Sequence, residues 1–221
     1  MDGTMTQRIG ILGGTFDPVH CGHLALARSA RGQYRLDRLL FVPAFMPPHK
    51  IGICEITAPA HRYRMVELAI GGEPDFEVCD VEFTREGPSY TVETLELLKR
   101  RFPGSEWFLI LGEDNLRNMD RWKDPDRIRA AATVLAAKRP GAETQWFRHA
   151  RGDLRSPSSQ AGAAAGGTAD EGPGVQWIRM EACPVSASKI RETLRGGGSP
   201  GPHELPTAVE DYIRRQKLYR A

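Results

Sequence analysis

The chain has 221 residues, enough for one domain with a sizeable core, and its 30 basic and 28 acidic side chains nearly balance at a net charge of +2, which argues against a dedicated nucleic-acid-binding protein. No run approaches the ~18 apolar residues of a membrane span, and the first seven residues lack the apolar core of a signal peptide. Four scattered cysteines without a C-x-x-C pattern indicate reduced thiols, so we expect a cytoplasmic protein without membrane or nucleic-acid partners.

The first predicted unit is a buried strand over residues 9–12, then a glycine turn, then a helix beginning near Gly22 or His23. These parts together form an anion site, because the turn lets a phosphate approach the backbone and the first helical N–H groups point toward it. His20 in the turn and His23 in the first helical turn fall on one side of that entry. On their own, two such histidines are equally compatible with helix capping or a chance metal site.

A second strand is predicted over residues 38–43. The segment 43–50 contains three prolines and is expected to be extended, carrying His49 and Lys50 toward the glycine turn. A helix capped by Thr57 and a strand over 76–81 are predicted to follow.

The next helix is predicted to begin at Ser89 or Thr91, one of which would cap it, with Tyr90 between them. Its exposed N–H groups would suit an anionic ligand.

The most hydrophobic run, residues 107–111, is the best candidate for a central strand. It ends at Gly112, and Asp114 lies just beyond, where ligands sit in open parallel sheets. Asp114 is also expected to cap the following helix, and Trp122 lies eight residues further on. A lone tryptophan is most often a core residue.

The next predicted element is a strand over 131–137 that ends near Arg139. Residues 151–174 are rich in glycine, alanine, serine and proline and are expected to form a flexible insertion. After a strand over 175–180, residues 184–221 are predicted to form a C-terminal helical part. Its first helix would be capped by Ser186 or its neighbour.

Five motifs occur in order: GGTFDPVHCGHL at 13–24, PPHK at 47–50, PSYTVETL at 88–95, GEDNL at 112–116 followed by Trp122, and SASKIR at 186–191. Together they resemble the bacterial nicotinate-nucleotide adenylyltransferases, nucleotidyltransferases with the HxGH motif. The resemblance implies an α/β fold, Rossmann-like and doubly wound, with a mostly parallel sheet of five to six strands. It also implies a single nucleotidyltransferase domain over 1–221.

The implied reaction joins the adenylyl group of ATP to nicotinate mononucleotide, giving nicotinate adenine dinucleotide and pyrophosphate in NAD biosynthesis. By the same resemblance the catalytic residues are His20, His23, Lys50 and Arg191. The implied ATP-binding residues are Gly13, Gly14, Thr15, Phe16, His20, His23, Gly112, Asp114, Ser186, Ser188 and Arg191. The implied nicotinate-nucleotide-binding residues are Phe16, His49, Lys50, Tyr90, Thr91, Trp122 and Arg139. Mg²⁺ would be carried by the ATP phosphates, without a metal site of the protein's own.

Two departures from the family pattern occur in the last motif, where Val185 replaces the usual isoleucine and Ser188 the usual threonine. Other interpretations are a sister adenylyltransferase for nicotinamide mononucleotide or phosphopantetheine, or a non-catalytic nucleotide-sensing module. A metal-binding protein that uses the two histidines would need a third ligand nearby. The sequence does not determine the oligomeric state, and a homodimer is one of the states it allows.

Overall fold

The computed structural model describes residues 6–50, 52, 55–138, 175–181 and 183–220. Arg139 and the insertion expected at 151–174 lie outside the described residues. Within the described ranges, no helix combines the length and the apolar character needed to cross a membrane.

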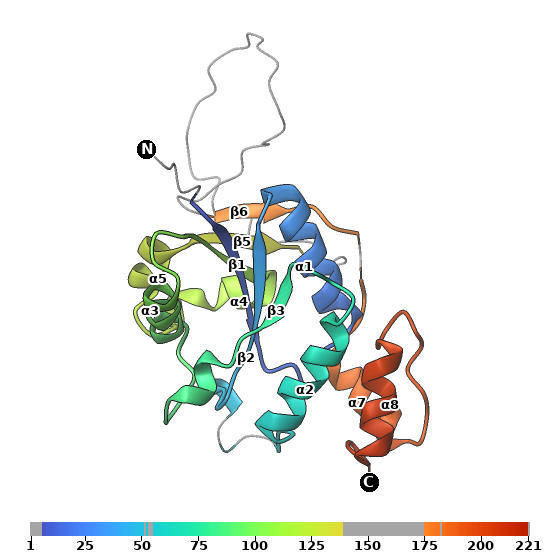
Figure 1. The fold of residues 1–221 in the computed structure, drawn as a ribbon. Helices are drawn as coiled ribbons and strands as arrows, with labels where there is room; N and C mark the ends of the chain where they lie inside the picture. Colours follow the sequence, from blue (N-terminus) through green and yellow to red (C-terminus); the bar gives the residue numbers. More distant parts are fainter. Residues whose placement is uncertain (1–5, 51, 53–54, 139–174, 182, 221) are drawn as a thin grey trace, which may run out of the picture.

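Six strands form one sheet in the order β3-β2-β1-β4-β5-β6, and every neighbouring pair is parallel (Figure 1). The strands are β1 Arg8–Gly14, β2 Arg38–Pro43, β3 Phe76–Val78, β4 Glu106–Gly112, β5 Thr133–Ala137 and β6 Val175–Ile178. This arrangement confirms the predicted doubly wound α/β class. The chain runs outward from β1 to β3 and then returns to β4 on the other side of β1. Ligands bind beyond the carboxyl ends of the strands at such a reversal.

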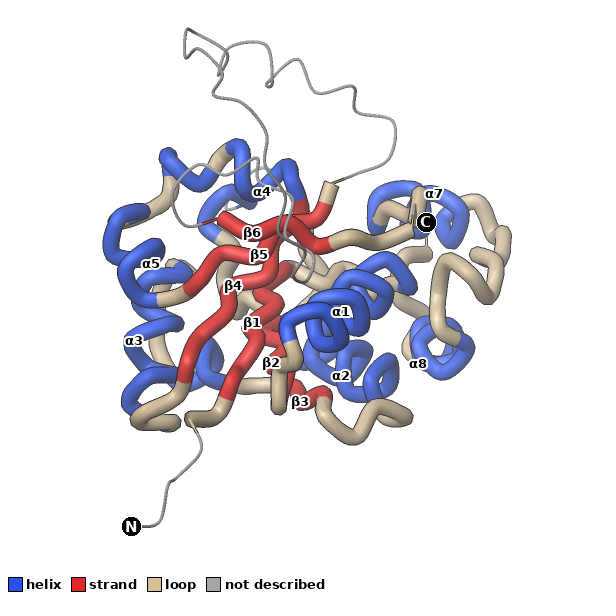
Figure 2. The backbone as a smooth tube through the Cα atoms, turned by 90° about the horizontal axis from the view of Figure 1, so that it is seen from above, coloured by secondary structure: helices blue, strands red, loops and turns tan. Residues whose placement is uncertain are grey.

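Helices cover both faces of the sheet, as the view from above shows (Figure 2). The helices are α1 Cys21–Tyr34, α2 Pro59–Ile70, α3 Thr91–Arg101, α4 Glu113–Arg117, α5 Pro125–Ala131, α7 Ala187–Arg195 and α8 Thr207–Arg215. Short 3₁₀ turns are η1 Pro48–Lys50, η2 Val81–Thr84 and η3 Met119–Arg121. Side chains of α1, α2, α7 and α8 share one buried cluster, whereas those of α3 and α5 belong to the other.

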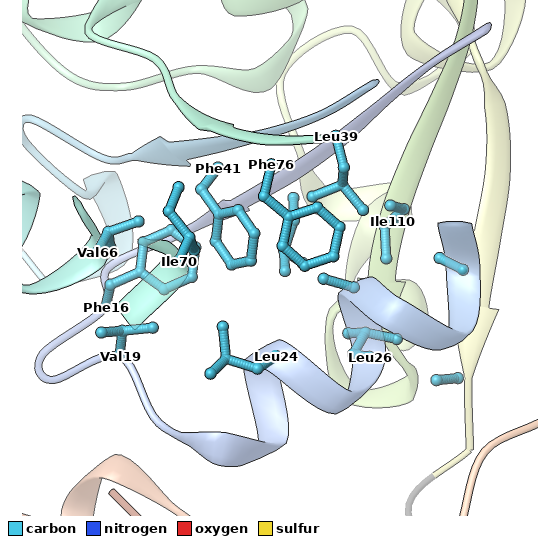
Figure 3. Packing of buried hydrophobic residues seen from close by; sticks show 14 of the residues in the cluster. Phe16, Val19, Leu24, Leu26, Leu39, Phe41, Val66, Ile70, Phe76 and Ile110 are labelled. Atoms are coloured by element: carbon cyan, nitrogen blue, oxygen red, sulfur yellow. The ribbon is translucent and has the colours of Figure 1, made fainter. Parts of the chain in front are cut away.

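The central strands are buried on both faces, which explains their nearly continuous apolar runs. In β4, Phe108 and Ile110 belong to the buried cluster that α1 shares, while Leu109 belongs to the cluster on the opposite face of the sheet. Phe16, from the turn after β1, also belongs to the α1 cluster, with its ring centroid 5.8 Å from that of Phe41 (Figure 3). The glycine turn is therefore anchored in the core.

Several predicted helix starts are wrong. Ala58 precedes α2, and the fixed φ of Pro59 suits its first position, so Thr57 does not cap this helix. Tyr90 precedes α3 without a side-chain cap, because the Ser89 hydroxyl accepts from the Met46 N–H instead. Ser186 does cap α7, where its hydroxyl accepts from the Lys189 N–H.

Two segments around the site also differ from expectation. Helix α4 begins directly after β4, with Gly112 at its N-cap, so Asp114 lies inside the first turn instead of capping it. An acidic side chain is favourable there because it faces the positive end of the helix dipole. Residues 48–50 form a 3₁₀ turn rather than continuing extended, since proline is tolerated in the first turn of a helix.

Candidate active site

The turn after β1 is tightly fitted around one aromatic ring. Phe16 is 2% exposed and has a φ of 51°, in the left-handed region. A Cβ atom at Gly14 would lie 3.1 Å from this ring, tighter than ordinary van der Waals contact. Glycine at position 14 therefore lets the ring fold back under the end of β1.

His20 and His23 form a stacked pair at the start of α1, with ring centroids 3.8 Å apart. The backbone N–H of His20 donates to Nδ1 of His23 at 3.2 Å. An Nδ1 that accepts a hydrogen bond carries no proton, so the N–H of a neutral His23 lies at Nε2, on the other side of the ring. Phe16 contacts His23 edge-on, at 5.0 Å between centroids. The His23 ring is thus fixed from two sides.

The glycine between the histidines is required by the His20 ring. A Cβ at Gly22 would lie 3.1 Å from both Cε1 and Nδ1 of that ring. We expect Gly22→Ala to push His20 out of the stack and to lower kcat by about tenfold, since small misplacements of catalytic groups are costly. Gly32→Ala is the matched control in the same helix, because a Cβ there meets no atom within 4 Å. Equal kcat values for the two variants would contradict this reading of the motif.

The start of α1 offers fewer backbone donors than the sequence predicts. The N–H of His20 is used by His23, and the N–H of Cys21 donates to the carbonyl of Glu204 at 2.9 Å. The N–H of His23 donates to the carbonyl of His20. For Cys21 the acceptor comes from the C-terminal part of the chain, whereas the other two hydrogen bonds are local to residues 20–23. An anion here would therefore depend more on the imidazoles than on helical N–H groups.

Helix α7 provides the donors that α1 lacks. Within the described ranges, the N–H groups of Ala187 and Ser188 donate to no acceptor, and the first turn of α7 holds no acidic side chain. Arg191 donates to the carbonyl of Asp17 at 2.6 Å, which brings the helix to the glycine turn, and to the Ser188 hydroxyl at 3.4 Å. The free N–H groups at the positive end of α7 would suit an anion bound beside the turn.

A cavity of about 610 Å³ lies against the same turn, beyond the carboxyl ends of β1 and β4. Seven of the predicted site residues line it: Gly13, Gly14, Thr15, His49, Tyr90, Thr91 and Trp122. The structure therefore brings together residues predicted from motifs almost 110 positions apart. The strand-order reversal between β1 and β4 explains why this crevice lies where it does.

The start of α3 faces this cavity with unused donors. Thr91 lines the cavity, and in the part of the chain that the structure describes neither its N–H nor that of Val92 donates to an acceptor. The loop before α3 is tied to the proline segment, because the Ser89 N–H donates to the Met46 carbonyl at 2.8 Å. A planar anion at this helix start would meet two N–H groups and the positive end of the dipole.

The remaining predicted residues lie apart from the cavity lining. Lys50 ends η1, next to His49, and does not line the cavity. Gly112 precedes α4, and Asp114 lies in its first turn. Neither residue lines the cavity. Burial lowers the pKa of His49, and the neighbouring Lys50 cation lowers it further. His49 therefore stays neutral near pH 7.

Sequence reasoning missed several polar residues that line the cavity: Glu82, Asn115, Asn118, Arg121 and Lys123. The sequence contained an indication of four of these five residues. Two asparagines three positions apart follow the central strand, and two basic residues flank Trp122. Glu82 gave no signal, because it follows the predicted strand 76–81 and belongs to none of the five motifs.

Arg62 was also missed, although it is 1% exposed and holds three loops. Its guanidinium donates to the carbonyl oxygens of Thr15 at 2.7 Å, Thr57 at 2.8 Å and Phe45 at 3.2 Å. Burial lowers the pKa of Arg62, while the carboxylate of Asp17 raises it. A charged residue on the apolar side of α2, beside Met65, was the available signal.

In the described ranges, no group of three or more histidine, cysteine or acidic side chains could hold a metal ion. The described thiols of Cys21, Cys79 and Cys183 are free.

Comparison with known proteins adds a family. The profile described as cytidylyltransferase-like matches residues 11–193. The probable nicotinate-nucleotide adenylyltransferase of Thermomicrobium roseum is 38% identical over 97% of this chain and 92% of its own length. Those of Citrifermentans bemidjiense and Rubrobacter xylanophilus are also 38% identical, over 96% and 97% of this chain and 98% and 93% of their own lengths.

Among solved structures, the chain is similar to the Plasmodium falciparum nicotinic acid mononucleotide adenylyltransferase complexed with NaAD. The TM-score is 0.72, with 17% identity, and the match covers 96% of this chain and 97% of that one. At this identity the likeness shows the fold, which agrees with the sheet order described above.

Proposed function

The chain belongs to the cytidylyltransferase-like family, in which its similar relatives are nicotinate-nucleotide adenylyltransferases, and we propose that it transfers the adenylyl group of ATP to nicotinate mononucleotide. The products are nicotinate adenine dinucleotide and pyrophosphate, and the reaction is a step of NAD biosynthesis. The nucleotidyltransferase domain is proposed to span 1–221, with 184–221 as its C-terminal helical part.

One observation carries this proposal most strongly. The glycine turn joins two candidate binding regions: the histidine pair follows it in the chain and Arg191 of α7 donates to it, while residues 13–15 of the turn line the cavity with Tyr90 and Trp122. A polyphosphate fits the first region, and an aromatic ring bearing an anion fits the second. The reaction must bring two phosphates together, and the turn lies where they would meet.

The nucleophile in this reaction is the 5′-phosphate oxygen of the acceptor, which is ionised at neutral pH. It forms a bond to the α-phosphorus of ATP as the bond from that phosphorus to the bridging oxygen breaks, and pyrophosphate leaves with the electron pair. No catalytic base or covalent intermediate is needed. Alignment of the two phosphates and stabilisation of developing charge supply the rate enhancement.

We assign these tasks to the glycine turn, the histidine pair, α7 and Lys50. His20 and His23 would donate to the ATP phosphates, and Ser188, Arg191 and Lys50 would surround the path of the pyrophosphate. Gly13, Gly14, Thr15 and Phe16 shape the junction, and Ser186 holds the start of α7. Gly112 and Asp114 are proposed to meet the nucleoside of ATP. Mg²⁺ would enter as part of the ATP substrate, on phosphate oxygens and water.

The cavity residues would bind the acceptor. The N–H groups at the start of α3, beside Tyr90 and Thr91, would receive the nicotinate carboxylate, and His49 and Arg139 would lie toward its phosphate. A reducing, cytoplasmic location is proposed because the described thiols are free. A homodimer remains a prediction that sedimentation of the purified chain would test.

Trp122 is proposed to stack on the pyridine ring. Aromatic stacking contributes about 1 kcal/mol beyond buried area, so we expect Trp122→Ala to raise KM for a pyridine mononucleotide roughly fivefold, whether the acceptor carries an acid or an amide. KM for ATP should stay unchanged. Steady-state kinetics with both acceptors tests this, and an effect confined to one acceptor would contradict stacking as the role of Trp122.

The experiment that tests the proposed function is a panel of acceptors with ATP, in which pyrophosphate release is followed. The panel contains nicotinate mononucleotide, nicotinamide mononucleotide and phosphopantetheine. We expect release with the first acceptor to be fastest by a wide margin. Faster release with phosphopantetheine would assign the chain to a sister activity, and ATP binding without release would favour a nucleotide-sensing module.

A further inference from the structure

Three segments far apart in the chain meet on Asp17 in the glycine turn, a residue only 5% exposed. Its Oδ1 accepts a 2.5 Å hydrogen bond from the hydroxyl of Tyr219, 202 residues away. Its Oδ2 accepts from the Thr57 N–H at 3.4 Å, and its carbonyl accepts from Arg191 at 2.6 Å. Asp17 therefore joins the turn to the segment after α8, to the segment before α2 and to α7.

The segment that carries Tyr219 is itself firmly placed. The Leu218 N–H donates to the Ile213 carbonyl at 3.0 Å, and both Leu218 and Tyr219 pack against the α1 core cluster. Burial raises the pKa of Tyr219, and the Asp17 carboxylate raises it further, so the phenol keeps its proton and donates it to Asp17. Tyr219 thus reaches the turn from a fixed position.

The turn is held on both sides of its strained residue. Arg62 holds the carbonyl of Thr15, and the contacts of Asp17 hold the next residue but one. Between them lies Phe16, with a φ of 51° that non-glycine residues adopt when their surroundings impose it. The Phe16 ring contacts His23 edge-on, and His23 stacks on His20. A continuous chain of contacts therefore runs from Tyr219 to the histidine pair.

We propose that Tyr219 and Asp17 are positioning residues, which hold the glycine turn so that Phe16 fixes the two histidines of the adenylyl-transfer site. This inference rests on the proposed function, because it assigns the histidines to ATP. Neither residue lines the acceptor cavity, and neither is assigned a contact with the reacting atoms. The role is to set geometry from a distance, through the turn.

Tyr219→Phe tests the proposal because it removes only the hydroxyl. The matched control is Tyr212→Phe, since the Tyr212 hydroxyl forms a 2.8 Å hydrogen bond with Nδ1 of His61 and thus also joins the C-terminal part to α2, but not to the turn. The measurements are kcat, KM for ATP, the melting temperature, and the imidazole ¹H–¹⁵N signals of His20 and His23. A purely structural hydroxyl would change the melting temperature without moving the last of these.

We expect Tyr219→Phe to lower kcat by about tenfold and to shift both imidazole signals, with a smaller change in KM for ATP. Tyr212→Phe should keep kcat within about twofold and leave the signals in place, while melting at a similar temperature to Tyr219→Phe. Equal kcat values for the two variants, or unshifted imidazole signals in Tyr219→Phe, would overturn the proposal.

A second set of variants tests whether Tyr219 and Asp17 act through the same interaction. In Asp17→Ala, which has no side-chain acceptor for the Tyr219 hydroxyl, the added Tyr219→Phe change should cost clearly less in kcat than it costs in the wild-type background, because contacting residues act on one interaction. Independent, multiplicative losses would contradict the proposal. If the wild-type chain adenylylates no pyridine mononucleotide, the proposed function fails, and the imidazole signals still decide whether Tyr219 positions the histidines.

Discussion

His23→Ala should lower kcat by about 10²-fold or more while the protein stays folded. The physical reason is that a preorganised donor aimed at charge developing in the transition state contributes more there than in the ground state. In this structure the His23 ring is fixed by the His20 N–H at Nδ1 and by the edge of Phe16, so its Nε2–H has a defined direction. His20→Ala should have an effect of the same order.

Steady-state kinetics with ATP and nicotinate mononucleotide measures this loss, and circular dichroism verifies the fold. His203→Ala is the control, because His203 is exposed and has no assigned role. Turnover of a folded His23→Ala protein close to that of the wild type would remove the histidine pair from the mechanism.

The second large effect concerns the acceptor, where we expect kcat/KM for nicotinate mononucleotide to exceed that for nicotinamide mononucleotide by about 10²-fold or more. The two acceptors differ only in a carboxylate against a carboxamide. The N–H groups of Thr91 and Val92 are donors at the positive end of α3, so they pair with a carboxylate and leave the amide hydrogens without acceptors. An unpaired buried polar group of this kind can cost several kcal/mol.

An acceptor in the cavity could bind the amide hydrogens and so reduce this discrimination. Glu82 lines the cavity and carries an acceptor carboxylate, but its oxygens already accept from the Phe45 N–H and the Thr94 hydroxyl. Arg121 and Lys123 add positive charge to the lining. The preference for nicotinate mononucleotide over nicotinamide mononucleotide should therefore persist.

The comparison needs the two mononucleotides at equal ATP, with pyrophosphate release as the signal. Thr91→Pro would remove one N–H at a position where proline is compatible with the first turn of a helix, and it should narrow the preference for the acid. Equal efficiency with both acceptors would overturn the assignment of the helix start and leave the adenylyl transfer itself unaffected.

The parts of the structure that could be predicted are those recorded in local patterns. Continuous apolar runs indicate strands buried on two faces, and β1, β2, β4 and β5 were found this way. The Ser186 cap depends on residues three positions apart and was also predicted correctly. Seven of the residues that line the cavity follow from the motifs together with the rule that ligands sit beyond the carboxyl ends of strands.

What the sequence did not predict depends on contacts between distant segments. The Cys21 N–H is taken by the Glu204 carbonyl, so the donor count at α1 could not be judged from the motif around it. Arg62 is meaningful only because three loops converge on it. Loop closure over such distances leaves no periodicity in the sequence. The cap of α3 could not be predicted either, because the Ser89 hydroxyl is used by the distant Met46 N–H.

The hydrogen bond between Tyr219 and Asp17 has a consequence for how the protein is made. A ribosome adds roughly 5–20 residues per second, so about 10–40 s separate the synthesis of two residues that lie 202 positions apart. The turn is translated first and its distant partner much later. During that interval β1 can pair with β2, while the carboxylate of Asp17 still lacks the hydrogen bond that the Tyr219 hydroxyl donates in the folded protein. Nascent chains therefore carry the nucleotide-binding motif before they carry the contact that holds it in place.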